Sequence, residues 1–422
     1  MKKFTKFGLS TTLVLAGFTL LSACSSSENT SSGKQAIEVF STKTENATTL
    51  KELAREFTKA NPNITVNVTA PADGGTVLKT RLTKNDIPDV ISGGGDATFL
   101  QLEKASVLKD QSSETYVKDI QSSYLKQMKV FTGTAKVYGV PYATNASGLI
   151  YNKDIFDKYG LSYPKTWAEF VKINEVLKSK GVTPLELDFQ GADNWTTMCV
   201  WNSVAPALEP VNFGKDRLAS KTSFVSDMKP VAQRFIDVIK LGQSNYMGTS
   251  YNDGLAAFAQ GKAAMLINGS WTIPVIRQTN KTINFGIVPF PTTNDTSKNT
   301  LSSGVDVLLA IGKNSKHQEA DKKFVTFMLK KEQAAKYIKE QAAFSAITGV
   351  DQTDSAMTAA SKEIAGGHVS DFPDHLYPAG FNMASLLSGI ALNENKNMPA
   401  SENISQFLKT ADQQYDIANT KK

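Results

Sequence analysis

Three carboxylates and one indole ring stand beside predicted strands of this chain. Three of them come a few residues after a run of alternating or continuous apolar residues, and the fourth lies at the start of such a run. They are Glu45, Asp96, Trp271 and Asp306. In open α/β sheets ligands collect outside the carboxyl ends of the strands, so side chains at these places are candidates for one binding site.

The residue types in this set suit a carbohydrate. A carboxylate such as Asp96 or Asp306 can accept hydrogen bonds from two hydroxyl groups of one sugar ring. The indole of Trp271 can cover the apolar face of the same ring. An amino-acid ligand would instead favour an arginine against its carboxylate, and no arginine follows these strands. We therefore expect a sugar site.

Each candidate also has a structural interpretation. Glu45 is placed to stabilise a helix that begins near Thr48, because acids are favoured at helix starts. Asp96 is a suitable N-cap for a helix through Phe99. Trp271 is flanked by apolar residues and would fit a core. The sequence leaves these alternatives open.

No motif for a metal or an organic cofactor is visible, so we expect neither. The three histidines are far from one another and from Cys199, which excludes a zinc-ligand spacing and a Cys/His nucleophile pair. We interpret Cys199 as a buried apolar residue. The run 93–95 is three glycines, but it lacks the Lys-Ser/Thr of a phosphate loop.

Two rival functions remain open. Two of the three acids could act as the acid and nucleophile of a surface glycosidase, if they lie about 5 to 9 Å apart. The chain could also be a polysaccharide-adhesion lipoprotein without a transporter. Our expectation is a binding protein that is not an enzyme.

The elements that must position these side chains alternate between strand and helix. Strands are predicted at 36–40, 64–68, 87–91, 263–267, 285–288 and 305–311. Helical spacing recurs at 50–57, around 77–82, at 255–259 and around 324–328, and the chain after Lys331 is mainly helical apart from a loop at 366–381. Such alternation indicates parallel α/β lobes. A body of nearly 390 residues exceeds what one core usually serves, which indicates two of them.

The first residues predict export and anchoring. Lys2, Lys3 and Lys6 precede a mostly apolar stretch at 7–21, which is the layout of a secretory signal covering residues 1–23. The ending Leu-Ser-Ala-Cys resembles a bacterial lipobox, so we expect Cys24 to carry the lipid. An ordinary signal peptide with an incidental cysteine is the alternative.

Net charge gives no sign of a nucleic-acid partner. The formal charge is +6, and it falls to +3 without residues 1–23. Basic and acidic residues are interspersed along the predicted helices, as on a solvated surface. Residues 24–35 are rich in Ser, Asn and Thr and predict a flexible linker.

A series of short motifs resembles one known family. In chain order they are Ala60-Asn61-Pro62, Ile87-Pro88-Asp89-Val90, Val137-Tyr138-Gly139-Val140-Pro141-Tyr142, Tyr151-Asn152-Lys153, Pro164-Lys165-Thr166-Trp167, Gly191-Ala192-Asp193-Asn194-Trp195, Phe258-Ala259-Gln260-Gly261-Lys262 and Asn268-Gly269-Ser270-Trp271. Their order and spacing are similar to those of the extracellular solute-binding proteins of carbohydrate ABC transporters (family 1). The likeness is strongest to multiple-sugar and raffinose-type binding lipoproteins of Gram-positive bacteria.

The resemblance implies a two-lobed α/β fold of the periplasmic-binding-protein type (type II), with the ligand cleft between the lobes. It places residues 36–144 and 302–344 in one lobe, and residues 145–301 and 345–422 in the other. It adds two residues to the site, Trp195 and, in the crossing segment, Asn145. The loop at 366–381 matches no part of the family pattern, and we expect it to help set the length and linkage of the sugar.

The resemblance also implies the partners. They are an oligosaccharide and the permease subunits of an ABC importer. The protein would be a monomer on the outer face of the cell membrane, held there by the lipid on Cys24.

Overall fold

Two separate β-sheets organise the part of the chain that the structure describes. This computed structural model describes residues 33–420 except 72, 73 and 379. The predicted signal peptide at 1–23, the anchor Cys24 and most of the predicted linker lie outside the described residues. Each sheet is surrounded by its own helices and has its own hydrophobic core.

The first sheet has the strand order β11-β4-β10-β3-β1-β2. Its strands are β1 (Gln35–Ser41), β2 (Ile64–Thr69), β3 (Val90–Gly93), β4 (Gly139–Thr144), β10 (Val305–Ile311) and β11 (Phe344–Ser345). Strands β1, β2 and β3 are mutually parallel, whereas β10 runs antiparallel to both β3 and β4. The beginning of β10 therefore lies at the edge of the sheet where β1 and β3 end.

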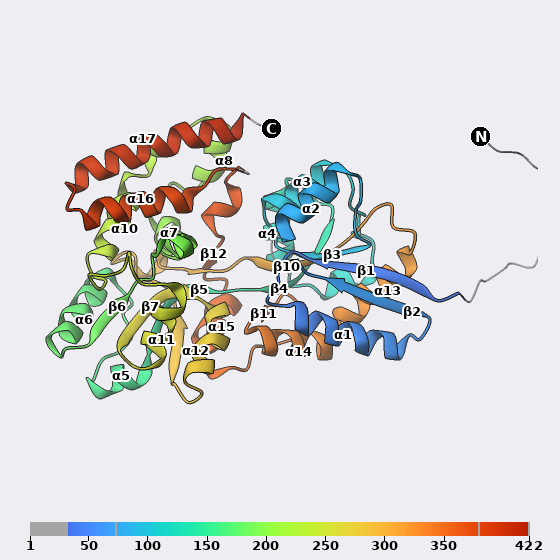
Figure 1. The fold of residues 1–422 in the computed structure, drawn as a ribbon, viewed down its shortest axis with the longest axis horizontal. Coiled ribbons are helices and arrows are strands. Elements are labelled where there is room, and N and C mark those ends of the chain that lie inside the picture. The colour runs from blue at the N-terminus through green and yellow to red at the C-terminus, as the bar shows by residue number, and fades with distance from the viewer. Residues whose placement is uncertain (1–32, 72–73, 379, 421–422) are drawn as a thin grey trace, which may run out of the picture. The chain divides into compact units, whose positions relative to one another are not determined.

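Helices cover both faces of this sheet. They are α1 (Ala47–Ala60), α2 (Gly74–Thr83), α3 (Ala97–Lys104), α4 (Ser122–Thr132), α13 (Gln318–Met328) and α14 (Lys331–Gln341). Figure 1 shows α1 and α14 on one side of the sheet and α2 and α3 on the other. Helix α1 forms where the spacing predicts it, because Leu50, Leu53, Ala54 and Phe57 recur on one face and are buried.

The second sheet has the strand order β12-β9-β5-β7-β6, and β8 also pairs with β5. Its strands are β5 (Ser147–Asn152), β6 (Thr183–Glu186), β7 (Ala263–Gly269), β8 (Phe285–Val288), β9 (Leu301–Ser302) and β12 (Val369–Ser370). Gly148 allows the close pairing of β5 with β8, because a Cβ atom there would lie 2.3 Å from the carbonyl oxygen of Val288.

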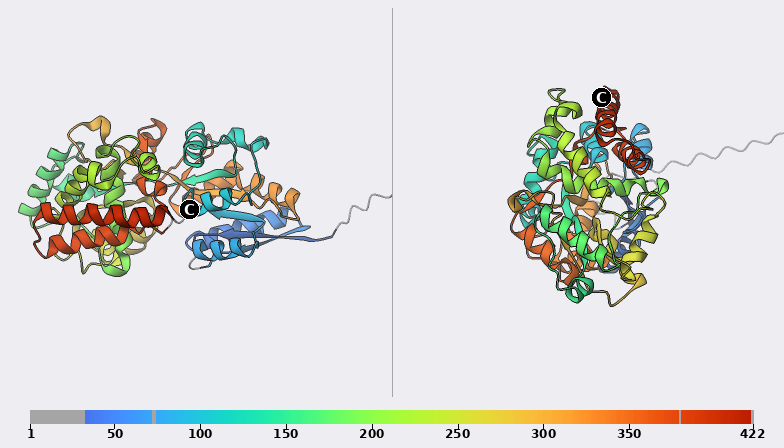
Figure 2. Two further views of the ribbon diagram at one scale, coloured as in Figure 1. Left: turned by 90° about the horizontal axis from the view of Figure 1, so that it is seen from above. Right: turned by 90° about the vertical axis from the view of Figure 1, so that its left-hand side faces the viewer.

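Most helices of the chain surround this second sheet. They are α5 (Lys153–Lys158), α6 (Trp167–Ser179), α7 (Thr197–Leu208), α8 (Phe213–Leu218), α9 (Phe224–Asp227), α10 (Lys229–Ile239), α11 (Tyr251–Ala259), α12 (Ile273–Thr279), α15 (Thr358–Ala365), α16 (Met383–Asn395) and α17 (Ala400–Asn419). The last two pack side by side, as Figure 2 shows. Thr166 is the N-cap of α6, since its side chain accepts from the backbone N–H of Glu169.

The chain passes between the sheets three times, twice through short segments and once through residues 346–368. Residues 145–146 connect β4 to β5, and residues 303–304 connect β9 to β10. The two segments contact each other, because the backbone N–H of Asn145 donates to the carbonyl of Gly304 over 3.3 Å. The predicted two-lobed α/β fold is confirmed, while the exact lobe boundaries stay a prediction.

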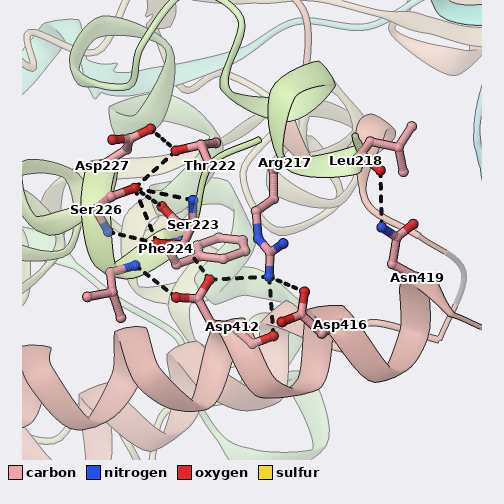
Figure 3. A network of polar contacts seen from close by, with 11 residues as sticks. Arg217, Leu218, Thr222, Ser223, Phe224, Ser226, Asp227, Asp412, Asp416 and Asn419 are labelled. Carbon is pink, nitrogen blue, oxygen red and sulfur yellow. Dashed lines mark hydrogen bonds and ion pairs between the residues drawn. The ribbon is translucent and has the colours of Figure 1, made fainter. Parts of the chain in front are cut away.

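A buried arginine ties the C-terminal helix α17 to α8 and α9 (Figure 3). Its guanidinium lies 2.6 Å from Asp416 and 3.3 Å from Asp412, and it stacks on the ring of Tyr415 at 4.4 Å. This residue is Arg217, whose side chain is 4% exposed. Asp412 also accepts from the backbone N–H groups of Phe224 and Val225, which begin α9.

Within residues 33–420, the helices are too short or too polar to pass through a lipid bilayer.

Candidate functional site

A polar cavity of about 260 Å³ lies where the crossing segments meet the first sheet. Three of the predicted site residues line it, and all three contribute polar atoms: Asp96, Asn145 and Asp306. Lys43 and His375, which were not predicted, line it as well. A larger hollow of about 710 Å³ lies beside Lys178 and Tyr246, but none of the predicted residues reaches it.

Asp306 is the centre of the polar contacts in this cavity. Its Oδ1 atom accepts from Nζ of Lys43 at 2.5 Å and from Nδ2 of Asn145 at 3.1 Å. Burial lowers the pKa of Lys43, but the charges of Asp306 and Glu45 outweigh it and raise this pKa overall. The ammonium group therefore stays charged, and it can donate to a ligand as well as to Asp306.

Asn145 links this contact to both crossing segments. Its side-chain nitrogen donates to Asp306, and its side-chain oxygen accepts from the backbone N–H of Gly304 over 3.4 Å. A single amide thus connects the segment after β4 with the segment before β10. Both segments pass from one sheet to the other. A change in the angle between the sheets would therefore alter the hydrogen bonds of Asn145.

Asp96 is the N-cap of α3, as its structural interpretation predicts, and it also lines the cavity. Its Oδ1 atom accepts from the backbone N–H groups of Thr98 and Phe99, which makes it the N-cap of α3. Within the described part of the chain, its Oδ2 atom has no hydrogen-bond partner. One oxygen therefore orients the side chain, and the other is available to a ligand.

Glu45 lies next to the cavity but is not one of its lining residues. Its carboxylate is 3.6 Å from Nζ of Lys43 and its side chain is 61% exposed. The helix-start interpretation is not supported, because the N-cap of α1 is Asn46 and the first turn of α1 contains no acid. Glu45 acts instead as a second, looser partner for Lys43.

Trp195 forms an exposed aromatic pair with Tyr251, a residue that the sequence did not single out. The two ring centroids are 5.0 Å apart, and Trp195 is 39% exposed although it is a large apolar residue. The carboxylate of Asp193 fixes the pair by accepting from the backbone N–H of Tyr251. Burial is the main cause that raises the pKa of the Tyr251 hydroxyl, and the negative charges of Asp188 and Asp193 add to it.

Trp271 follows β7 in a short 3-10 helix, Ser270–Thr272. Its ring packs over Gly269, where a Cβ atom would lie 2.1 Å from the indole. The indole N–H is buried and has no acceptor among the described residues. Trp271 is at the same sheet edge as Asn145, because Ser147 pairs with Gly269, but it does not line the cavity.

Three further residues, Lys43, His375 and Tyr251, were not among the predicted site residues. Lys43 comes two residues after β1 ends, so its position was a usable signal. His375 lies in the loop at 366–381, which was expected to affect specificity, but the sequence singled out no residue of that loop. Tyr251 comes directly after the helix cap Ser250, which makes it resemble an ordinary helix-start residue.

The described residues contain no group of three or more His, Cys, Asp or Glu side chains that could hold a metal ion. Cys199 is buried, as predicted, and its thiol lies 3.7 Å from Oδ1 of Asn268. Burial raises the pKa of this thiol well above its usual value, which suppresses the reactive thiolate.

Behind the aromatic pair lies a buried acid, Asp188. Its side chain packs against Gly254 of α11, and its Oδ2 atom has no hydrogen-bond partner among the described residues. Burial raises the pKa of Asp188 to about 7. The pKa values of Glu186 and Glu209 are also raised to about 7 by burial.

We expect the ligand-free protein to melt at a higher temperature at pH 6 than at pH 8. The folded-state pKa of Asp188, about 7, lies above its unfolded value of about 4, so the folded state binds the proton more tightly. Its stabilising effect is therefore complete below pH 4 and is lost as the pH rises through 7, at a cost on the order of 1 kcal/mol between pH 6 and 8. Thermal unfolding at both pH values measures this, and Asp188→Asn should reduce the difference. An equal difference in that variant would contradict the assignment.

The fold and the site together define a class of protein. Two α/β lobes are joined by short crossing segments, and charged and polar side chains gather at the crossing, as in proteins that close around a small ligand. The model of the bacterial extracellular solute-binding proteins matches residues 41–335. The chain belongs to this family.

Individual relatives agree with this assignment. The multiple sugar-binding protein of Streptococcus mutans is 34% identical over 363 residues, which is 83% of this chain and 84% of that protein. The melibiose/raffinose/stachyose-binding protein MelE of Bacillus subtilis is 24% identical over 78% of this chain and 79% of its own length. Among solved structures, that of the SBP RafE in complex with raffinose has a TM-score of 0.75 and 29% identity, and covers 89% of this chain and 99% of that one.

Proposed function

We propose that this protein captures an oligosaccharide outside the cell and delivers it to the permease of an ABC importer, without catalysing a reaction. The observation that carries the proposal is the contact of Asp306 with Lys43 and Asn145 in a cavity at the crossing segments. The cavity offers charged and neutral hydrogen-bonding groups to the hydroxyl groups of a sugar. Its lining residues include no arginine, the residue that would favour a ligand with a carboxylate. The names of the two relatives and the raffinose complex support a sugar as the ligand.

Each predicted residue has a role in this proposal. Oδ2 of Asp96 and the carboxylate of Asp306 accept hydroxyl groups, while Lys43 and Asn145 donate to ring or hydroxyl oxygens. Trp195 and Tyr251 offer an aromatic face for a sugar ring from the second lobe. Trp271 is close to the crossing segment and would meet the ligand after a change in the angle between the lobes.

Because the proposed site is divided between the two lobes, binding of the ligand would favour closure of the lobes. Ligand that contacts both walls favours the closed form by its differential affinity for that form. The permease would then recognise the closed, loaded protein. Micromolar affinity, which suits transport, corresponds to about 8 kcal/mol, and a few charge-assisted hydrogen bonds with a stacked ring account for that.

The anchor and the oligomeric state belong to the same proposal. A lipid on Cys24 would hold the monomer at the outer face of the cell membrane and raise the local concentration of receptor near its permease. Cys24 and the signal peptide precede the described residues.

A thermal-shift panel tests the proposed ligand class. Purified protein is heated with raffinose, stachyose, maltotriose and a fructooligosaccharide, each at millimolar concentration. A sugar present at a hundred times its Kd stabilises the folded state by about 2.7 kcal/mol, so at least one sugar should raise the melting temperature by several degrees. Glycerol at the same concentration is the control for nonspecific stabilisation.

Two results would contradict the proposal. The first is a melting temperature that no sugar changes, because a transport receptor must bind its cargo in the native state. The second is the appearance of new reducing ends when the protein is incubated with the sugar that binds, because this would show a glycosidase.

A further inference from the structure

We propose that His375 forms an end wall of the sugar site and limits the length of the oligosaccharide that the site accepts. The inference rests on the proposed function and assigns to one residue the specificity role expected of the loop at 366–381. Among the lining residues of the cavity, His375 alone comes from a part of the chain beyond Asp306. It lies in the short 3-10 helix Pro373–Leu376, which follows strand β12.

The segment that carries His375 is fixed to the second lobe. Oδ1 of Asp374 accepts from Nδ2 of Asn202 on α7 at 3.0 Å. The hydroxyl of Tyr377 accepts from the indole N–H of Trp201, also on α7, at 3.0 Å. Both Trp201 and Tyr377 are buried. The position of His375 is therefore set by packed neighbours on either side.

From this base the imidazole reaches the first lobe. Its ring centroid lies 5.2 Å from that of Phe372 and 6.5 Å from that of Phe131, which belongs to α4. A sugar ring that slid between two flat partners would need about 3.5 to 4.0 Å on each side, which is at least about 7 Å between their planes. The rings of His375 and Phe131 are tilted by 57° and so do not form two parallel faces that could hold a sugar ring. His375 lines the cavity and packs against Phe131, which does not line it, so we place the end of the site at His375.

The crossing segment has no side chain at the point where His375 packs on it. A Cβ atom at Gly304 would lie 3.0 Å from Cε1 of His375 and 3.0 Å from Cδ2 of Phe372. Gly304 is also the residue whose backbone N–H donates to Asn145. His375 therefore packs on the crossing segment at the residue whose backbone N–H holds the Asn145 amide, and that amide contacts Asp306.

Charge fixes the orientation of the imidazole. Nδ1 lies 3.7 Å from Oδ1 of Asp371. Burial lowers the pKa of His375, but Asp371, Asp374 and Asp96 outweigh it and raise this pKa to about 9, so the ring is protonated at neutral pH. Lys43 and Asp306 complete the charged groups of the cavity. The charged ring is paired with Asp371 of its own segment, which favours one orientation of the imidazole.

The test compares two sugars that differ by one hexose ring, raffinose and stachyose. Calorimetry gives the ratio of their affinities for the wild-type protein and for His375→Ala. We expect the truncation to shift this ratio at least fivefold in favour of stachyose, because it opens the end of the site. His375→Phe keeps the ring volume and should keep the wild-type ratio even if both affinities fall. His317→Ala, which changes a histidine that directly precedes α13 and does not line the cavity, is the matched control and should change neither affinity.

The outcomes separate this inference from the function on which it rests. A wild-type protein that binds neither these sugars nor any other of the panel refutes the proposed function and the end wall with it. A wild-type protein that binds them, together with a ratio in His375→Ala within twofold of the wild-type ratio, refutes the end wall alone. If His375→Ala does not fold, His375→Asn must show the same shift in the ratio, because it also shortens the side chain.

Discussion

Asp306→Asn should weaken sugar binding by about 100-fold. Asp306 accepts from both Lys43 and Asn145, and its side chain is only 22% exposed. The substitution removes the negative charge that strengthens hydrogen bonds to hydroxyl groups, and it leaves the Lys43 ammonium without its nearer partner. Hydrogen bonds to charged groups contribute about 1.5 to 3 kcal/mol each, and the loss of about 2.7 kcal/mol corresponds to a hundredfold change in Kd. Isothermal titration calorimetry with the sugar identified by the panel measures it.

A control for this variant exists in the same chain. Asp354→Asn also removes the charge of an acid that is paired with a cation, Arg277, but Asp354 does not line the cavity. It should leave the affinity unchanged. If Asp306→Asn bound the sugar within threefold of the wild-type affinity, the contact with Lys43 and Asn145 would be structural, and the site would have to be sought at the aromatic pair.

Asp412→Ala should lower the free energy of unfolding by about 3 kcal/mol. The carboxylate accepts from the backbone N–H groups of Phe224 at 2.7 Å and Val225 at 3.1 Å, and it lies 3.3 Å from the Arg217 guanidinium. Its removal leaves two donors at the start of α9 without their acceptor and weakens the partnering of a buried charge, each of which costs about 1 to 3 kcal/mol. Chemical denaturation followed by circular dichroism measures the change.

The neighbouring carboxylate on α17 provides the comparison. Asp416 contacts the same guanidinium at 2.6 Å, but its side chain is 59% exposed, whereas that of Asp412 is 17% exposed. Asp416→Ala should therefore cost less than about 1 kcal/mol, as expected for an exposed ion pair. Equal losses for the two variants would contradict the importance of the backbone contacts. Neither variant should alter sugar affinity, since neither residue lies at the cavity.

Much of the fold follows from local patterns. The helix predicted at 50–57 forms because its apolar residues share one face, and it ends before Pro62, which cannot continue a helix. The strands predicted at 36–40, 64–68, 263–267 and 285–288 are all present. Periodicity and chain breakers act over a few residues, so they can be read without knowledge of the rest of the molecule.

The sequence also indicated which acids lie at the ends of strands, but it did not indicate the direction of the strand that Asp306 begins. Asp306 begins its strand, whereas Asp96 follows one, yet both line the same cavity. The reason is that β10 runs antiparallel to β3, which brings its first residues to the edge where β3 ends. The direction of a strand inserted from late in the chain depends on pairing over a long sequence distance, and no local pattern encodes it.

The sequence by itself determined several of the strands and helices, the family motifs and the candidate acids, because each of these depends on residue types at short spacing. Only the tertiary structure decided how the acids are used. It brought Lys43 to Asp306 across 263 positions, gave one oxygen of Asp96 to a helix cap, and set His375 between Phe131 and Phe372. Such contacts arise from the packing of whole lobes. The partner of a charged side chain is set by the tertiary fold, which brings together residues far apart in the sequence.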